Sequence, residues 1–370
     1  MKHLLGISGG KDSAALAIYM ARNYPNLDIE YYTCDTGKEL QETYDLIERL
    51  ESVLGKRISR YDNYDHEQST ESNPFDHFLN AYGHYLPSAT ARWCTKKMKL
   101  EPFEKHVSDE PTISYVGIRG DENREGYISK RQNIQTIFPF RRNIWSGDVI
   151  DLVLSDNNRS KFLEVYMKYC ASEEEVICVQ VINEPISLTN TTRQKADRLL
   201  DFGVFRFNRV VHELLRETDY PIGRLDDFPL IANEDNLGIH DIYNILNDSG
   251  VGIPAYYLPI EFEVEHEGEI RKGQYSRSRS GCFFCFYQQK IEWVWLLEQH
   301  PKLFAEAMNY EKDGFTWSEE PLVDLCVPER VKQIKLDYIR KQESARNKFG
   351  TNWKDELLKQ EGLSCPSCFI

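Results

Sequence analysis

The sequence predicts an α/β protein with a doubly wound, mostly parallel sheet, a helical insertion and a helical C-terminal region. Short apolar segments alternate with amphipathic helical segments through the first 118 residues, which is typical of a parallel sheet with helices on both faces. Helical patterns dominate from about residue 145 to 238 and again in the last third. The chain has 370 residues, 41% of them hydrophobic, which is enough for about two domains with buried cores.

The elements of the predicted sheet follow in chain order. A strand at residues 2–7 runs into the loop SGGKDS and the helical segment AALAIYMARNY. A second strand, IEYYTCDT, precedes the amphipathic segment GKELQETYDLIERLESVL. Further strands are expected at residues 57–61 and 112–118. Ligands of such sheets bind at the carboxyl ends of the strands. The loops SGGKDS, TCDTG and GIRGDE all follow strands, so we expect them to meet in one crevice.

The pattern of the remaining chain suggests three parts. We expect a nucleotide-binding core at residues 1–144, a helical insertion at 145–238, and a C-terminal part at 239–370. The C-terminal part first returns to the core with HDIYNILNDSGVGIPAYY. It then continues through a cysteine-rich segment into helical stretches.

Charge and hydropathy exclude some classes of protein. Lys and Arg number 45 and Asp and Glu 59, which gives a net charge of −14. Such a surface repels polyanions on average, so DNA contact requires local basic patches. Three patches occur, at residues 119–142, 271–290 and 330–348, with solvated helix faces and phosphate-site rims as the alternative reading. No apolar run approaches the ~18 residues of a membrane span. The N-terminus lacks the pattern of a secretory signal, so we expect a cytoplasmic protein without membrane contact.

The strongest motif is the loop SGGKDS, which consists of Ser8, Gly9, Gly10, Lys11, Asp12 and Ser13. Two glycines let the backbone approach a phosphate closely. The N–H groups at the start of the following helix, together with the helix dipole, favour an anion. Lys11 adds a positive charge and the serines add hydroxyl donors. The loop lacks the G-x-x-x-x-G-K-[ST] spacing of a Walker A motif.

The loop resembles the pyrophosphate loop of the PP-loop ATP pyrophosphatase superfamily, which grips the β and γ phosphates of ATP while the α phosphorus is attacked. The segments CDTG at residues 34–37, ARWCTKKMKLEPF at 91–103 and VGIRGDENREGY at 116–127 resemble the phosphoadenosine phosphosulfate reductase-like family of this superfamily, as does the later segment that begins SGCFFCF. The resemblance covers residues 1–142 and 238–315. It implies a fold like that of the adenine nucleotide alpha hydrolases. Among these relatives the chain looks most similar to the DNA phosphorothioation proteins.

The resemblance implies ATP or an adenylyl sulfate in the crevice, with Lys11, Asp12 and Arg119 as candidate catalytic residues. Candidate nucleotide ligands are the six residues of the loop together with Asp35, Arg92, Lys96, Lys99, Arg119, Glu122 and Arg124. Arginine makes forked contacts with phosphate, and lysine supplies a point charge. Mg²⁺ takes oxygen ligands, which could come from Asp12, Asp35, Asp121 and Glu122. Helix caps and structural salt bridges are the alternative roles for these acids.

The nine cysteines include two Cys-x-x-Cys pairs, Cys282 with Cys285 and Cys365 with Cys368. In a chain without an export signal, such pairs indicate metal, cluster or redox chemistry rather than disulfides. Phenylalanines surround the first pair, and an apolar shell suits an iron–sulfur cluster. Cys170, Cys178 and Cys326 lie in apolar helical stretches and are expected to be core residues.

Iron–sulfur relatives in this family take their other ligands from a Cys-Cys pair, of which only Cys94 is present here, because Thr95 replaces the second cysteine. We therefore expect a [4Fe–4S] cluster held by Cys94, Cys282 and Cys285, with Cys365 or Cys368 as the fourth ligand. The alternative is Zn²⁺ held by the two Cys-x-x-Cys pairs.

Together these motifs predict an ATP pyrophosphatase that activates an acceptor oxygen by adenylation for sulfur insertion, with the DNA backbone as the acceptor that the resemblance favours. A cysteine desulfurase would supply the sulfur, and other DNA-modification proteins are expected partners. One alternative is a phosphoadenylyl or adenylyl sulfate reductase, although its C-terminal E-C-G-[LI]-H motif is absent from the sequence. The other alternative is a nucleotide-binding regulatory subunit.

Overall fold

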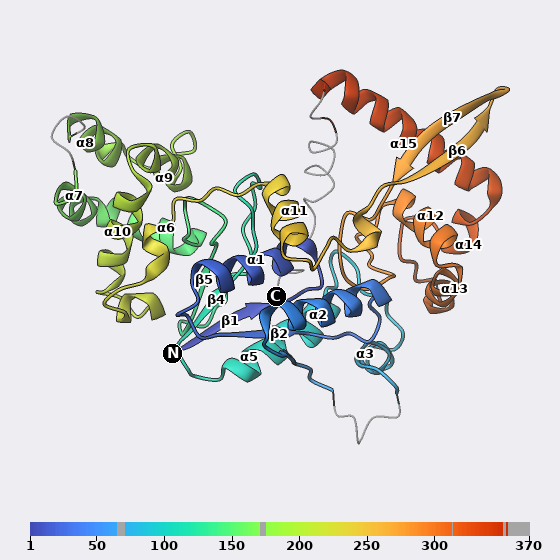
Figure 1. Cartoon of the computed structure of the whole chain (residues 1–370), viewed down its shortest axis with the longest axis horizontal. Helices are drawn as coiled ribbons and strands as arrows, with labels where there is room; N and C mark the ends of the chain where they lie inside the picture. The colour runs from blue at the N-terminus through green and yellow to red at the C-terminus, as the bar shows by residue number, and fades with distance from the viewer. Residues whose placement is uncertain (65–70, 171–174, 313, 351–352, 354–370) are drawn as a thin grey trace.

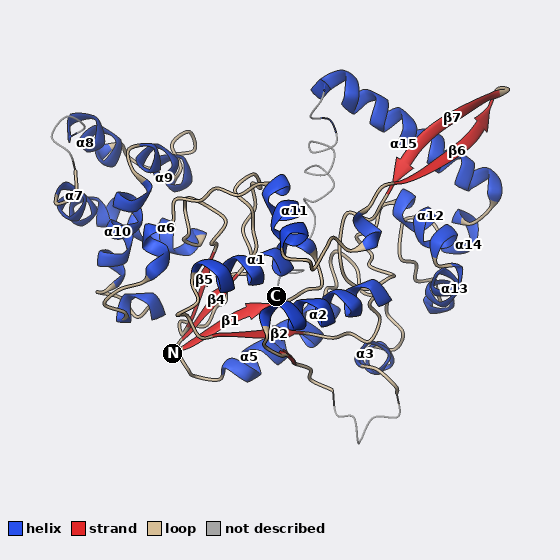
Figure 2. Cartoon of the chain, in the orientation of Figure 1, coloured by secondary structure: helices blue, strands red, loops and turns tan. Residues whose placement is uncertain are grey.

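The computed structural model describes residues 1–64, 71–170, 175–312, 314–350 and 353. Its centre is a five-stranded sheet of order β3-β2-β1-β4-β5 in which every pairing is parallel, which confirms the predicted α/β class (Figure 2). The strands are β1 (Lys2–Gly6), β2 (Ile29–Thr33), β3 (Ile58–Arg60), β4 (Thr112–Tyr115) and β5 (Ile134–Ile137).

Helices cover both faces of this sheet. The helices of this part are α1 (Lys11–Asn23), α2 (Gln41–Leu54), α3 (Pro74–Ala81), α4 (Trp93–Thr95), the π-helical turn η1 (Lys96–Leu100) and α5 (Glu101–Val107). Neighbouring residues of a strand point to opposite faces. Leu5 of β1 packs with Leu16 of α1 and Leu46 of α2, whereas Leu4 packs with Phe103 of α5. The sheet is therefore doubly wound, as the alternating sequence pattern predicts.

A group of helices follows β5 and lies on one side of the sheet (Figure 1). These helices are α6 (Gly147–Val153), η2 (Asp156–Asn158), α7 (Arg159–Met167), α8 (Glu175–Asn183), α9 (Thr192–Asp201), α10 (Val204–Leu215), η3 (Pro221–Arg224) and η4 (Pro229–Ala232). The indole of Trp145 is buried and donates to Asn208 Oδ1 at 2.9 Å. Cys178 is also buried among these helices, as expected for a core cysteine. Helix α11 (Ile239–Asp248) then returns to pack on α1.

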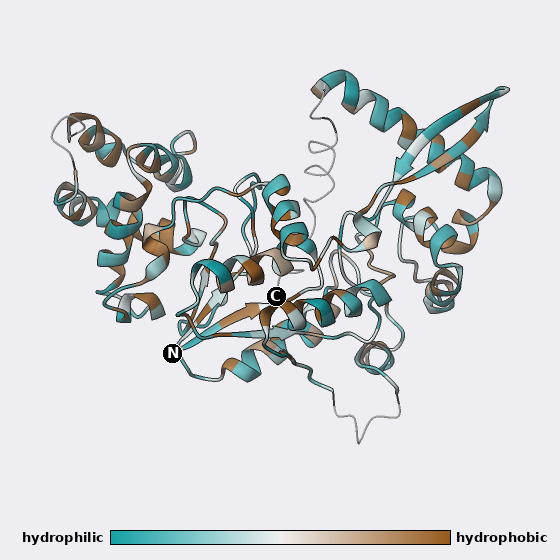
Figure 3. Cartoon of the chain, in the orientation of Figure 1, coloured by the Kyte–Doolittle hydropathy of each residue, from teal (hydrophilic) through white to brown (hydrophobic). Residues whose placement is uncertain are grey.

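The C-terminal region contains an antiparallel hairpin of β6 (Ile260–His266) and β7 (Glu269–Tyr275), which the sequence analysis did not predict. The turn η5 (Ala255–Tyr257) precedes the hairpin, and helices α12 (Lys290–Gln299), α13 (Pro301–Tyr310), α14 (Leu322–Leu325) and α15 (Pro328–Phe349) follow it. Figure 3 shows α15 as mainly hydrophilic, with a few apolar residues along it. Ile334, Leu336 and Ile339 are the apolar residues that bury this helix against the rest of the region.

Within the described residues, no helix has both the length and the apolar character needed to cross a bilayer.

Candidate active site

The loop SGGKDS joins β1 to α1 at the carboxyl edge of the sheet. Gly9 has a φ of +72°, and a Cβ there would lie 2.2 Å from Cγ2 of Thr43 in α2, so glycine is required. The carbonyl oxygen of Gly9 accepts a 2.7 Å hydrogen bond from the buried hydroxyl of Tyr256. The amide of Ser8 donates to the hydroxyl of Ser13 at 3.2 Å. These contacts hold the loop from α2, from Tyr256 and from within the loop itself.

The start of α1 has the features of an anion site. Gly10 precedes the helix without a side-chain capping bond, so the first turn offers backbone N–H groups and the positive end of the helix dipole. Lys11 is buried, with its ammonium 4.3 Å from the ring centroid of Tyr257 and 3.6 Å from the carboxylate of Asp12. Burial opposes the charge of Lys11, but Asp12 together with the hydroxyl groups of Tyr257 and Tyr243 outweighs it, so the pKa of Lys11 is raised.

Arg119 connects the loop to the segment that follows β4. Its guanidinium donates to Asp12 at 2.8 Å and to Asp121 at 2.8 Å, and it lies 3.1 Å from Glu122. Burial of the Asp12 carboxyl opposes ionisation, but the charges of Lys11 and Arg119 outweigh it and lower the pKa of Asp12. Asp12 is therefore a buried carboxylate held between two cations.

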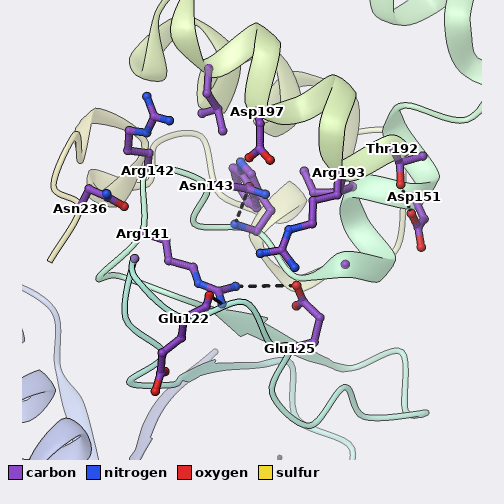
Figure 4. A pocket seen from close by; sticks show the side chains of 15 residues that line it. Glu122, Glu125, Arg141, Arg142, Asn143, Asp151, Thr192, Arg193, Asp197 and Asn236 are labelled. Atoms are coloured by element: carbon purple, nitrogen blue, oxygen red, sulfur yellow. Dashed lines mark hydrogen bonds and ion pairs between the residues drawn. The ribbon is translucent and has the colours of Figure 1, made fainter. Parts of the chain in front are cut away.

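Glu122 and Arg141 hold the segment after β4 in place around Arg119. Glu122 accepts from Arg124 at 2.9 Å, and the guanidinium of Arg141 donates to the carbonyl oxygens of Arg119, Glu122 and Arg124. Arg141 also lines a cavity of about 170 Å³ at the junction with α6 and α9. Figure 4 shows the side chain of Arg193 of α9 pointing toward Arg141. Burial lowers the pKa of Arg141 to about 10, with the charge of Arg193 adding to the shift.

The loop after β2 forms the opposite wall of the crevice. Asp35 Oδ1 accepts from the amide of Gly37 at 2.8 Å and from the hydroxyl of Tyr44 at 2.9 Å, so Asp35 is a structural acceptor in this state. Thr36 donates to Glu39 at 2.9 Å. A cavity lies between this loop and SGGKDS, and it is lined by Ser8, Thr33, Asp35, Glu39, Thr43, Arg60 and Lys99 among others.

A second cavity, the cysteine cavity, adjoins the first through Lys99, which lines both. Cys94, Cys282 and Cys285 line it together with the aromatic side chains of Phe75, Phe284 and Trp317. Cys282 Sγ lies 3.2 Å from the hydroxyl of Thr36. The backbone of Phe283 donates to the carbonyl oxygen of Lys38 at 3.0 Å, which ties the cysteine segment to the loop after β2.

The donors of the cysteine cavity suit a soft metal centre. Thiolates bind iron–sulfur clusters and Zn²⁺, and the shell around these thiols is apolar. The described residues nevertheless contain no group of three or more His, Cys, Asp or Glu side chains already gathered closely enough to hold a metal ion. The residues present thus fit the donor chemistry of a cluster but not its full ligand number. Cys365 and Cys368 lie outside the described residues.

Burial dominates the electrostatics of these thiols. It raises the pKa of Cys94 to about 11, with the neighbouring Cys285 adding to the shift and Lys99 opposing it. Burial also raises the pKa of Cys282 well above its usual value, and the carboxylate of Glu39 adds to that shift. Glu39 Oε2 itself is buried with no hydrogen-bond partner among the described residues. Without a metal, these thiols are protonated at neutral pH.

The structure brings most of the predicted residues to one edge of the sheet. Arg119, Glu122 and Arg124 gather beside SGGKDS, and Asp35 and Lys99 lie across the crevice. Arg92 lies farther out, with its guanidinium 5.9 Å from the ring centroid of Tyr287. Sequence reasoning missed a set of residues that complete the site, namely Glu39, Thr43, Tyr256, Tyr257 and Ser280. A Cβ on Gly10 would lie 2.7 Å from the Ser280 hydroxyl, and no local motif signals that contact.

Replacing Arg119 by alanine is expected to lower the free energy of unfolding by about 3 kcal/mol, because Asp12 would stay buried with only Lys11 facing it. The double variant Arg119→Ala with Asp12→Asn should be less destabilised, since it removes both charges. Arg142→Ala is the matched control, because Arg142 makes a 3.0 Å pair with Asp201 that is largely exposed, and such pairs contribute about 0–1 kcal/mol. Urea denaturation measures all three variants. Equal destabilisation by Arg119→Ala and Arg142→Ala would contradict the role given to Asp12.

Comparison with known proteins confirms part of the resemblance. Residues 2–147 match the family model of the phosphoadenosine phosphosulfate reductase domain. This region therefore resembles a domain of that type, and the match leaves the substrate open. An uncharacterized protein of Methanocaldococcus jannaschii is 30% identical over an alignment of 148 residues, which covers 36% of this chain and 28% of that protein. The chain thus spans less than a third of this relative. No solved structure was found to match the chain.

Proposed function

We propose that this protein cleaves ATP between its α and β phosphates to adenylate an acceptor oxygen, and that sulfur then replaces this oxygen on a phosphodiester of DNA. The observation that carries the proposal is the buried network of Lys11, Asp12 and Arg119 at the mouth of the SGGKDS loop. It combines an uncapped helix start with fixed positive charge, which suits a pyrophosphate leaving group.

In the first step an acceptor oxygen attacks the α phosphorus of ATP. The bond from that phosphorus to the oxygen bridging the β phosphate breaks, and pyrophosphate leaves with the electron pair. The amides of the loop and the ammonium of Lys11 would bind the departing phosphates. Arg119 is held by three carboxylates and would act mainly by keeping Asp12 and the loop in place. Mg²⁺ would neutralise the phosphates, with Asp12, Asp121 and Glu122 as the nearby oxygen donors.

In the second step a persulfide sulfur, supplied by a cysteine desulfurase, attacks the phosphorus of the adenylated phosphodiester. AMP leaves and carries the original acceptor oxygen. A second cysteine thiolate then attacks the remaining sulfur–sulfur bond, which gives the phosphorothioate and a disulfide that an external thiol reduces. The cysteine cavity lies next to the nucleotide crevice and supports this assignment.

Cys94, Cys282 and Cys285, with Cys365 or Cys368, would hold a [4Fe–4S] cluster, and Zn²⁺ is the alternative metal. When bound, a cluster would place inorganic sulfide and thiolate sulfur in an apolar environment beside Lys99. The other DNA-modification proteins expected as partners would deliver DNA or sulfur to this site.

The proposed activity is tested with anaerobically purified protein and ATP labelled at the α or the γ phosphate. With water as the acceptor oxygen, the expected products are AMP and pyrophosphate. The α,β-methylene analogue of ATP should not be cleaved, and this control separates the activity from contaminating phosphatases. Release of ADP and inorganic phosphate would overturn the proposal.

Reduction of an adenylyl sulfate is a second candidate function, because the match over residues 2–147 is to a reductase domain. It predicts release of sulfite from adenylyl sulfate or its 3′-phosphorylated form when a dithiol is supplied. Sulfur insertion predicts no sulfite and requires ATP. An assay of sulfite release and an assay of ATP cleavage therefore separate the two functions.

A further inference from the structure

An open groove lies beside the cysteine cavity and is not used by any step above. We call it the aromatic groove and define it by Tyr82, Tyr85, Arg92, Lys96, Tyr127 and Lys130, which line a space of about 730 Å³. The side chains come from the end of α3, from α4 with η1, and from the loop after β4.

The aromatic rings of the groove are both exposed and held in place. Tyr82 is 41% exposed and Tyr85 is 38% exposed. The ring of Tyr82 stacks on Trp93 with centroids 5.2 Å apart, and the ring of Tyr85 packs edge-on against Phe315 at 4.8 Å. Trp93 is itself fixed by a 3.0 Å hydrogen bond to the carbonyl oxygen of Tyr85. Each tyrosine is therefore a rigid apolar platform in contact with water.

The charge of the groove is positive, in contrast to the net charge of −14 of the whole chain. Lys96 and Lys130 are exposed and form no ion pair with any described residue. Two acidic side chains, Glu101 and Glu104, also line the groove, so its three lining cations leave a net charge of about +1. Glu101 pairs with Lys97 at 2.9 Å, and Glu104 accepts from the hydroxyl of Tyr127 at 2.9 Å. The lysines are thus available to an anionic ligand.

The groove is continuous with the candidate active site. Thr95 lines both the groove and the cysteine cavity, and Lys99 lines both the cysteine cavity and the crevice beside SGGKDS. Residues 93–100, which form α4 and the π-helical turn η1, therefore contribute side chains to all three spaces. A ligand bound in the groove would have one end beside the thiols.

We propose that the aromatic groove binds an unpaired strand of nucleic acid, with phosphates near Lys96 and Lys130 and bases stacked on Tyr82 and Tyr85. Rigid tyrosines next to unpaired lysines are the combination that binds single strands, because every base has a π face and the backbone is a polyanion. In a duplex the base faces are covered by their neighbours, so the tyrosines would have nothing to stack on. The claim that the bound strand is the acceptor of sulfur rests on the proposed function. The claim that the groove binds a strand does not.

The test measures the anisotropy of a fluorescent oligothymidylate of about 20 nucleotides, which is enough to fill a groove of this kind. The double variant Tyr82→Ala with Tyr85→Ala should bind at least about 10-fold more weakly, since each stacked base contributes about 1–3 kcal/mol. Tyr82→Phe with Tyr85→Phe keeps both rings and should bind like the unaltered protein, which would show that the rings rather than the hydroxyl groups bind the strand. Phe205→Ala is the control for an exposed aromatic elsewhere, because Phe205 is 48% exposed on α10.

The charge contribution is measured from the salt dependence of the same binding. Lys96→Gln with Lys130→Gln should reduce the slope of log affinity against log salt by about 0.7 for each lost phosphate contact. Lys332→Gln, in the basic segment 330–348, should leave the slope unchanged. Unaltered affinity and slope in the groove variants would overturn the proposal. Tighter binding of the corresponding duplex would also overturn the proposal. The same holds if the alanine variants lose binding to a protein partner while they still bind the oligonucleotide.

The same samples separate this inference from the proposed function. The double variant Tyr82→Ala with Tyr85→Ala should still cleave ATP to AMP and pyrophosphate in the absence of nucleic acid, with water as the acceptor. If the unaltered protein binds the oligonucleotide through the groove but does not cleave ATP, the proposed function fails and the groove stands. If it cleaves ATP but the groove variants bind normally, the groove fails and the proposed function stands.

Discussion

Replacing Lys11 by alanine is expected to abolish pyrophosphate release, with a loss of at least about 100-fold in kcat/KM, the range found when one preorganised charge or donor is removed from a transition state. The Lys11 ammonium is buried at the start of α1, 3.6 Å from the carboxylate of Asp12 and 4.3 Å from the ring centroid of Tyr257. No other lysine among the described residues lies in that loop. The loss should therefore not be compensated by a neighbour.

The same substitution should leave the fold intact, because Asp12 keeps its 2.8 Å pair with Arg119. Lys56→Ala is the matched control: Lys56 pairs with Asp28 on an exposed surface and its removal should change neither activity nor stability noticeably. Product analysis by chromatography and thermal unfolding measure the two properties on the same samples. A Lys11→Ala protein that is folded and fully active would contradict the assignment of SGGKDS as the phosphate loop.

Replacing Cys282 by serine is expected to remove the metal centre. Serine keeps the size of the side chain but replaces a soft thiolate donor with a hydroxyl that binds iron and zinc poorly. The backbone bond from Phe283 to Lys38 remains, so the segment should keep its position. Anaerobically purified protein is expected to be brown and to contain iron and labile sulfide, and the Cys282→Ser protein is expected to be colourless and to contain neither.

Cys326→Ser is the control for this experiment, because Cys326 lies at the end of α14, outside the cysteine cavity. It should retain the full metal content. One zinc per chain without iron in the unaltered protein would replace the cluster with the alternative site. Metal content unchanged by Cys282→Ser would show that the cysteine cavity is not the metal site at all.

The sequence predicted local features of this site better than distant ones. The string Ser8–Ser13 was sufficient to predict the strand–loop–helix junction that the structure shows, because the strand, the loop and the helix start are consecutive. The hydrogen bond from Tyr256 to Gly9 joins residues that are far apart in the chain, and neither residue carries a pattern that reveals the other. The grouping of Cys94 with Cys282 was expected only through a family resemblance.

The hairpin of β6 and β7 was not predicted, although the sequence contains a signal for it. The segment IEFEVEH alternates apolar and acidic residues, which is the period of a half-buried strand, and the structure buries Phe262 and Val264 while the intervening glutamates are exposed. The signal was therefore present in the sequence. The aromatic groove, in contrast, arises from the packing of α3, α4 and the loop after β4, and no single segment of sequence shows it.

The contacts that shape the phosphate loop also bear on how the protein is made. Gly9 is held by residue 256, Gly10 packs against residue 280, and the loop after β2 is bonded to residue 283. During synthesis the first 147 residues emerge long before these supports, because chains are made from the N-terminus at about 5–20 residues per second. The ribosome-bound core would thus hold an incomplete nucleotide site until most of the chain has emerged.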